Sequence, residues 1–136
     1  MSMFGMDSLV MGQRCVLVVD DDPAILRALV GVFERNGFLA DCAASAKEAI
    51  EKSKLRRYDV ALIDFRLPDM DGVEVLIHAD FKNTLKIMLT GFPSLITGIQ
   101  AEEYGVEAYL RKPIHPQELL SLVKTKLSSQ DNRHYL

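Results

Sequence analysis

The chain has 136 residues, which is the length of one domain with a substantial hydrophobic core. Hydrophobic residues make up 49% of it and charged residues 26%, the mixture expected of a soluble globular protein. The formal net charge of -3 argues against the broad basic surface of a nucleic-acid-binding protein. No apolar stretch reaches the roughly 18 to 20 residues that a membrane-spanning helix needs, so we expect no membrane contact.

Residues 1–13 and the two cysteines bear on where the protein works. The first 13 residues include four Met but lack the charged start and the cleavage pattern of a signal peptide, so we expect a disordered N-terminal segment there. Cys15 and Cys42 lie within apolar segments, at a spacing that fits no zinc site. Buried free thiols are typical of a reducing compartment, and we therefore expect a cytoplasmic protein.

The first half of the chain contains two strand–helix units. Pro23 marks the start of the first helix, because proline at this position lacks only an N–H that would stay unpaired, and Asp22 is the expected N-cap. A capping box, Ser45 to Glu48, marks the start of the second helix. In chain order, we expect a strand over 14–20, a helix over 23–36, a weaker strand over 38–43 and a helix from 45 to about 55.

The second half continues with three more units. An apolar run ends in Asp64 and is followed at once by a loop with Pro68 and Gly72, as expected for a strand buried on both faces. Gly98 costs an expected helix about 1 kcal/mol relative to Ala, so we expect that helix to be the loosest. The expected strands cover 60–63, 85–89 and 106–110, and the expected helices cover 73 to about 80, 94–104 and 116–127. The domain then covers 14–128, with 129–136 as a polar tail or linker remnant.

This alternation predicts a doubly wound α/β domain, with a parallel sheet, right-handed crossovers and helices on both faces. In such a sheet the carboxyl ends of the strands lie at one edge, and open α/β sheets bind their ligands there. The polar residues that follow four of the strands are therefore expected to meet: Asp20 with Asp21, Asp64, Thr90 and Lys112.

Together these residue types fit phosphoryl chemistry. Three carboxylates a few Å apart repel one another, and a divalent cation such as Mg²⁺, which prefers oxygen ligands, relieves that repulsion. A Lys ammonium and a Thr hydroxyl are suited to binding phosphoryl oxygens. Taken singly, each residue has an ordinary explanation as a helix cap, a turn residue or a surface lysine. Their convergence at four strand ends predicts a site for a transferring phosphoryl group.

From Arg14 to Leu127 the chain resembles a receiver domain of the two-component response regulators, of the chemotaxis-regulator type. The motifs that carry the resemblance are Val18-Val-Asp-Asp-Asp-Pro23, Asp64-Phe-Arg-Leu-Pro-Asp-Met-Asp-Gly72, Met88-Leu-Thr-Gly91 and Tyr109-Leu-Arg-Lys-Pro113. The resemblance implies a flavodoxin-like fold with five helices and a five-stranded parallel sheet in the order 2-1-3-4-5. It also implies a cis peptide bond between Lys112 and Pro113.

The resemblance implies a role for each site residue. Asp64 is the implied phosphoacceptor, which attacks a phosphohistidine on a sensor histidine kinase or a phosphotransfer protein. Lys112 and Thr90 would bind the phosphoryl oxygens, and Tyr109 would follow Thr90 from an exposed to a buried position. The implied ligands of Mg²⁺ are Asp20, Asp21, Asp64 and the backbone carbonyl of Arg66. Arg66 and Phe92 stand at positions that modulate hydrolysis of the acyl phosphate in the family, and we expect them to prolong its lifetime.

The resemblance also implies partners. A downstream protein or an output domain would bind the face made by the fourth helix, the fifth strand and the fifth helix, and phosphorylation would allow a homodimer to form. We expect neither direct nucleic-acid binding nor membrane contact. The chain is either a stand-alone regulator or a receiver cut from a larger protein.

Two other functions compete with a phosphoacceptor switch. A pseudo-receiver would keep the fold as an interaction module without phosphorylation, but degenerate receivers typically lose an acid, the lysine or the phosphoacceptor, and this chain keeps all of them. A magnesium-dependent phosphohydrolase would use Asp64 as its nucleophile, but Arg66 stands where its general acid would be, and the chain has no room for a cap over the substrate. We therefore predict a signalling phosphoacceptor that catalyses only its own phosphorylation and dephosphorylation.

Overall fold

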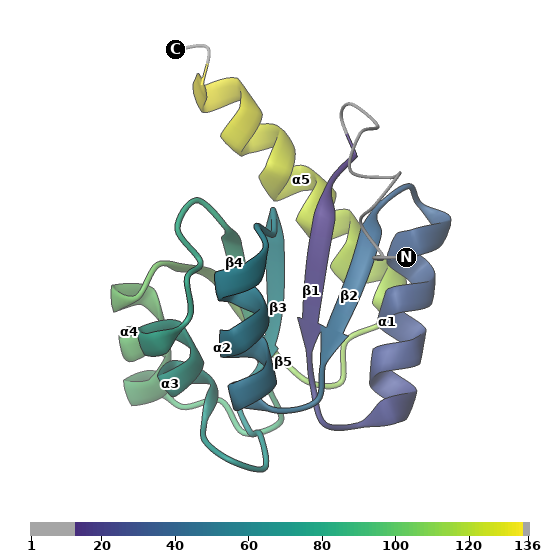
Figure 1. The fold of residues 1–136 in the computed structure, drawn as a ribbon. Helices are drawn as coiled ribbons and strands as arrows, with labels where there is room; N and C mark the ends of the chain where they lie inside the picture. The colour runs from purple at the N-terminus through teal and green to yellow at the C-terminus, as the bar shows by residue number, and fades with distance from the viewer. Residues whose placement is uncertain (1–12, 135–136) are drawn as a thin grey trace.

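A computed structural model of the protein describes residues 13–134 and, for the end of the last helix, side chains up to Asp131. Apart from Gln13, the segment expected to be disordered lies outside these residues. Strands and helices alternate five times within the described part of the chain (Figure 1). The elements are β1 (Cys15–Val19), α1 (Pro23–Arg35), β2 (Leu39–Ala43), α2 (Ala46–Leu55), β3 (Val60–Asp64), α3 (Gly72–His78), β4 (Leu85–Thr90), α4 (Leu95–Glu103), β5 (Val106–Arg111) and α5 (Pro116–His134).

The five strands form one parallel sheet in the order β2-β1-β3-β4-β5. This confirms the predicted doubly wound, flavodoxin-like architecture. The order reverses between β1 and β3, and a crevice for ligands opens at such a reversal in open α/β sheets.

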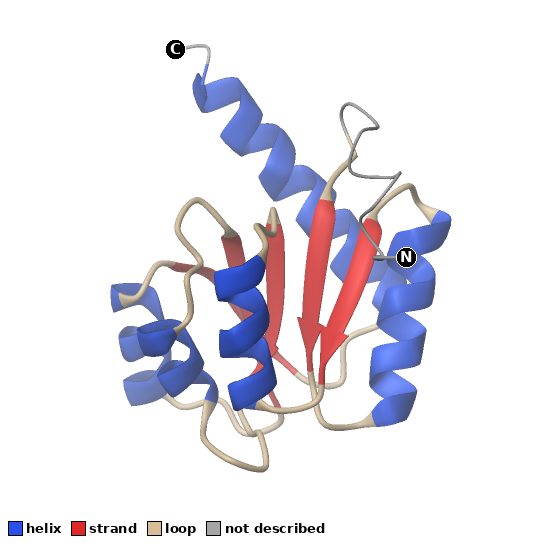
Figure 2. Cartoon of the chain, viewed as in Figure 1, coloured by secondary structure: helices blue, strands red, loops and turns tan. Residues whose placement is uncertain are grey.

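The helices cover both faces of the sheet (Figure 2), and Figure 1 shows α2 in front of it and α5 behind. Successive residues of β1 point to opposite faces, so Val16 and Val18 pack with α1 and α5, whereas Leu17 and Val19 pack with α2, α3 and α4. All four of these β1 side chains are buried. The central strands are therefore apolar on both faces, as a parallel sheet between two helical layers requires.

The predicted helix starts are confirmed by their caps. Asp22 accepts a hydrogen bond from the N–H of Ala24 at the start of α1. At the start of α2, Ser45 Oγ accepts from the N–H of Glu48, and the Glu48 carboxylate reaches back to the N–H of Ala44. Each cap satisfies an N–H that the first turn of a helix leaves without a backbone partner.

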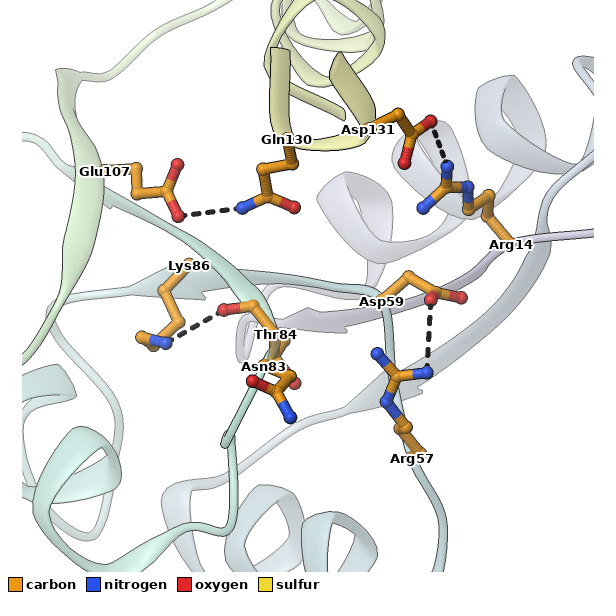
Figure 3. A pocket seen from close by; sticks show the side chains of 9 residues that line it. All are labelled: Arg14, Arg57, Asp59, Asn83, Thr84, Lys86, Glu107, Gln130 and Asp131. Carbon is orange, nitrogen blue, oxygen red and sulfur yellow. Dashed lines mark hydrogen bonds and ion pairs between the residues drawn. The ribbon is translucent and has the colours of Figure 1, made fainter. Parts of the chain in front are cut away.

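The end of α5 differs from the prediction. The apolar pattern ends at Leu127, but the helix continues to His134, so most of the expected polar tail is helical. The reason is long-range: Gln130 donates a hydrogen bond to Glu107 on β5, and Asp131 forms an ion pair with Arg14 at the start of β1 (Figure 3). None of the helices within residues 13–134 is both long and apolar enough to cross a membrane.

Candidate functional site

The carboxyl ends of the strands form the lower edge of the sheet in Figure 1. Asp20 and Asp21 follow β1, Asp64 is the last residue of β3, Thr90 is the last residue of β4, and Lys112 follows β5. The order of the strands places β1 next to β3 and β3 next to β4. The carboxyl ends of β1, β3 and β4 therefore lie side by side at this edge.

Three carboxylates gather at this edge. One oxygen each from Asp20, Asp21 and Asp64 lies within 4.8 Å of the others. Asp20 is 2% exposed and Asp64 is 6% exposed, while Asp21 faces solvent. Among the described residues, this is the group of acidic, His or Cys side chains close enough to hold a metal ion. Three carboxylate oxygens with one open side suit Mg²⁺, a hard cation that is bound by a few carboxylates and keeps several waters.

A single lysine lies between two of these acids. Lys112 Nζ is 2.9 Å from Asp20 Oδ2 and 3.3 Å from Asp64 Oδ2. The backbone holds Lys112 in place, because its N–H donates to the carbonyl of Thr90 at 2.7 Å. The Lys112–Pro113 peptide bond is cis, as the resemblance implied. Burial lowers the pKa of Lys112, but the hydrogen bond to Asp20 and the charge of Asp64 outweigh it and hold the pKa above the ordinary value. The ammonium is therefore charged at neutral pH.

The surroundings of Asp64 raise the pKa of its carboxyl group. Burial, and after it the charge of Asp20, raises the pKa of Asp64 above its ordinary value, although Lys112 and the N–H of Arg66 act in the other direction. The N–H of Arg66 is 3.4 Å from Asp64 Oδ1. One ammonium thus compensates three carboxylates incompletely, and an added cation would stabilise the ionised form of Asp64.

Thr90 ends β4 beside the acids and is almost completely buried. Its Oγ1 accepts a hydrogen bond from the N–H of Phe92 at 3.1 Å, which leaves the hydroxyl able to donate to another oxygen. Tyr109, on the neighbouring strand β5, is half-buried, and its hydroxyl accepts from the N–H of Ser94, the N-cap of α4, at 3.3 Å. Its ring lies against Gly98: a Cβ at position 98 would lie 3.5 Å from Tyr109 Cδ2. Tyr109 therefore contacts both the start and the middle of α4.

The loop after Asp64 turns back tightly on itself. The N–H of Gly72 donates to the carbonyl of Phe65 at 2.6 Å, and Arg66 and Asp71 form an isolated antiparallel bridge. A Cβ at position 72 would lie 3.0 Å from the carbonyl oxygen of Asp64 and from Phe65 Cα, both of which belong to the backbone and cannot easily move. The close approach therefore requires glycine here.

Two features of the site could not be seen in the sequence. The guanidinium of Arg66 lies 5.2 Å from the centre of the Phe92 ring, so the loops that follow β3 and β4 are in contact over the site. Asp69, in the loop after β3, accepts hydrogen bonds from the N–H groups of Ala46 and Lys47 in α2. Both contacts join residues more than 20 positions apart, and local sequence patterns carry no signal for such pairs.

The sequence model for the response regulator receiver domain matches residues 16–124. The acid tolerance regulatory protein ActR of Rhizobium meliloti is 37% identical over 110 residues, which cover 79% of this chain and 57% of that protein. The transcriptional regulatory protein ResD of Bacillus subtilis is 36% identical over 121 residues, which cover 88% of this chain and 50% of that protein. The chain thus spans about half the length of these curated relatives.

Solved structures share the fold. A CheY-like response regulator receiver domain protein from Methanospirillum hungatei superimposes with a TM-score of 0.85 at 36% sequence identity. The match covers 90% of this chain and 99% of the other.

Proposed function

The chain belongs to the response regulator receiver domains, and we propose that it accepts a phosphoryl group on Asp64 from a sensor histidine kinase or a phosphotransfer protein and then changes conformation. The observation that carries this proposal is the charge cluster at one sheet edge. Three carboxylate oxygens lie within 4.8 Å of one another, with the Lys112 ammonium 2.9 and 3.3 Å from two of the acids.

In the proposed reaction, a carboxylate oxygen of Asp64 forms a bond to the phosphorus of a phosphohistidine. The P–N bond breaks, its electron pair stays on the imidazole nitrogen, and that nitrogen takes up a proton. Lys112 already lies beside the nucleophile and would bind an oxygen of the incoming phosphoryl group, while the buried hydroxyl of Thr90 would donate to another. Because the phosphoryl group is already reactive as phosphohistidine, the domain contributes mainly the positions and the charges of its side chains.

Bound Mg²⁺ would neutralise negative charge on the phosphoryl oxygens. The residues proposed to hold it are Asp20, Asp21, Asp64 and the backbone carbonyl of Arg66. The grouping of the three carboxylates supports this assignment, because one oxygen of each lies within 4.8 Å of the others and a cation among them would relieve their repulsion.

The change of conformation is proposed to run from Asp64 through Thr90 and Tyr109 to α4. Phosphorylation adds roughly 1.5 to 2 negative charges in a confined space. A Thr90 hydroxyl drawn toward those charges gives up its bond to the N–H of Phe92, and Tyr109, bonded to the start of α4, can move after it. Within α4 only Ala101 is buried, and Gly98 in the middle of the helix lowers its intrinsic stability, which suits an element with two arrangements of similar free energy.

Two apolar surfaces support the proposed partners. On the output side, Phe92, Leu95 and Ile96 at the start of α4 are 75%, 80% and 73% exposed, and we propose that a downstream protein, an output domain or a second phosphorylated copy binds this helix together with β5 and α5. On the donor side, a cavity of about 510 Å³ beside Lys112 is lined by apolar residues of α1 and of the loop after β5. We propose that the phosphoryl donor binds here, because the cavity adjoins Lys112, whose ammonium contacts Asp64.

We propose that this domain itself contacts neither nucleic acid nor membrane. Relatives named as transcriptional regulators are about twice as long as the segment they share with this chain, so in such proteins another domain would contact nucleic acid. Cys15 and Cys42 are free thiols, which supports the proposed cytoplasmic location.

Mass spectrometry tests the proposal directly. We expect the protein, incubated with Mg²⁺ and acetyl phosphate, to gain the mass of one phosphoryl group, and Asp64→Asn to gain none. Asp131→Asn is the control, because it removes a carboxylate at the other edge of the sheet and should leave the gain unchanged. A wild-type protein that gains no mass would overturn the proposal in favour of a phosphorylation-independent pseudo-receiver.

A further inference from the structure

The loop that follows Asp64 is tied at its tip to α2. Asp69 Oδ1 accepts a hydrogen bond from the N–H of Ala46 at 2.9 Å, and Asp69 Oδ2 accepts from the N–H of Lys47 at 2.9 Å. These two N–H groups belong to the first turn of α2, where the helix itself offers them no carbonyl partner. A carboxylate with one oxygen for each of them therefore completes the helix end from a different segment of the chain.

The anchor on α2 is firmly held. Ala46 and Ala49 are fully buried against the sheet, and Ser45 and Glu48 cap the same turn. The bonds of Asp69 also hold its pKa below the ordinary value, the bond from Lys47 first, so the carboxylate stays charged and continues to accept both bonds at neutral pH.

Only Leu67 and Pro68 separate this anchored tip from Arg66. Pro68 has a fixed φ, and Leu67 and Met70 pack partly against the core under the loop. The other end of the loop is closed by the Gly72–Phe65 hydrogen bond and the Arg66–Asp71 bridge. The backbone of Arg66 is thus held from both sides, and the bonds of Asp69 supply one of the two sides.

We propose that Asp69 is a positioning residue for the phosphoacceptor site: by fixing the loop tip on α2, it holds the backbone of Arg66 in one place beside Asp64. This inference rests on the proposed function, in which the carbonyl of Arg66 is a ligand of Mg²⁺. Asp69 contacts neither the metal nor the phosphoryl group. Its effect is to reduce the number of loop conformations among which the metal site must be selected.

Two alternative roles for Asp69 need controls. In the first, Asp69 only stabilises α2 as a helix cap; in the second, it acts only through its negative charge. Ser45→Ala removes a cap from the same end of α2 without touching the loop. Glu74→Gln removes an exposed acid from α3, near the same loop, and leaves the loop tip in place. These two variants are the matched controls for Asp69→Ala.

The first measurement is the dissociation constant for Mg²⁺, determined by calorimetry on the metal-free protein. We expect Asp69→Ala to weaken binding about tenfold, the lower end of the effect of outer-shell partners on metal sites, and Asp69→Asn, with one acceptor oxygen left, to weaken it less. Ser45→Ala should lower the thermal midpoint and leave the dissociation constant unchanged, and Glu74→Gln should change the constant less than twofold, as expected for a screened surface charge. Equal constants for Asp69→Ala and either control would overturn the inference.

The second measurement is amide hydrogen exchange in the metal-free protein. The N–H of Gly72 should exchange at least tenfold faster in Asp69→Ala than in the wild type or in Ser45→Ala, because the loop that it closes has lost its second attachment. Unchanged exchange at Gly72 would show that the tip does not hold the loop. This readout needs neither metal nor phosphoryl donor, so it still decides the role of Asp69 if the wild type takes up no phosphoryl group.

Discussion

The two edges of the sheet both carry clusters of charged side chains, but their charge balance differs. At the amino edge, a cavity of about 570 Å³ is lined by three cations and three acids, namely Arg14, Arg57, Lys86, Asp59, Glu107 and Asp131 (Figure 3). At the carboxyl edge, Asp20, Asp21 and Asp64 face the single ammonium of Lys112. The lining of the amino-edge cavity thus contains equal numbers of cations and acids, whereas the three acids of the carboxyl edge are paired with one ammonium.

The charged groups of the amino edge are bound to one another, to a side-chain amide or to the backbone. Arg14 pairs with Asp131, Glu107 accepts from Gln130 at 2.9 Å, and Lys86 donates to the backbone carbonyls of Thr84 and Phe81 at 2.8 and 3.2 Å. The bonds of Asp131 and Gln130 fasten the end of α5 to the sheet. An excess of acid over cation, and not the presence of a large polar cavity, distinguishes the candidate site of this domain.

Substituting the lysine at each edge tests this difference, with the largest expected effect at Lys112. We expect Lys112→Met to slow phosphorylation by acetyl phosphate about 100- to 1000-fold, because a preorganised charge next to the transferring phosphoryl oxygens is lost. Lys86→Met is the matched control at the amino edge: it removes bonds to two carbonyls and should lower the thermal midpoint while the rate stays within twofold of the wild type. Time courses by mass spectrometry measure both rates. A rate that falls equally in the two variants would mean that the balance of charge does not separate the edges.

Thermal unfolding as a function of pH and Mg²⁺ tests the excess of acid at the carboxyl edge. The folded-state pKa of Asp64 lies above its ordinary value of 3.8, so the folded protein binds the proton more tightly than the unfolded chain does. In metal-free buffer the free energy of unfolding should therefore fall as the pH rises from this ordinary value through the folded-state pKa. Asp64→Asn should lose that part of the pH dependence.

At neutral pH, Mg²⁺ at 100 times its dissociation constant should add about 2.7 kcal/mol, or on the order of 10 °C in the thermal midpoint. The gain should shrink as the pH is lowered into the same interval, because protons compete with the metal for Asp64. Asp131→Asn should keep the full gain. Loss of the gain in this amino-edge variant would contradict the assignment of the cation to the carboxyl edge.

The contact between Arg66 and Phe92 gives the smallest expected effect and concerns how open the carboxyl edge is to water. Phe92→Ala removes the aromatic partner of the guanidinium, an exposed interaction of about 0.5 to 1 kcal/mol, so loss of the phosphoryl group should become about two- to fivefold faster. The decay of the phosphorylated mass after removal of the donor measures this rate. Leu95→Ala is the control, since Leu95 is equally exposed on α4; an unchanged decay in Phe92→Ala would show that the stack does not shield the site.

Much of the fold follows from local patterns. The alternation of apolar runs with capped helical segments predicted the order of all ten elements, because burial on both sides of a parallel sheet and the needs of helix ends impose patterns over a few residues. The convergence of Asp20, Asp21, Asp64 and Lys112 followed as well, since parallel strands place their carboxyl ends at one edge of the sheet.

Local patterns do not predict features that depend on contacts between residues far apart in the sequence. The polar residues 129–134 looked like a tail, and their helix forms because Gln130 and Asp131 meet Glu107 and Arg14. Asp69 lies in the loop after β3, and only the fold brings its carboxylate to the first turn of α2. Which elements form, and which groups share an edge of the sheet, can be read from the amino-acid pattern, because both follow from periodicity and topology. Which polar side chains bond across the chain depends on the fold, because a hydrogen bond needs its donor and acceptor placed to within a few tenths of an ångström of about 3 Å, and no local pattern relates segments so far apart.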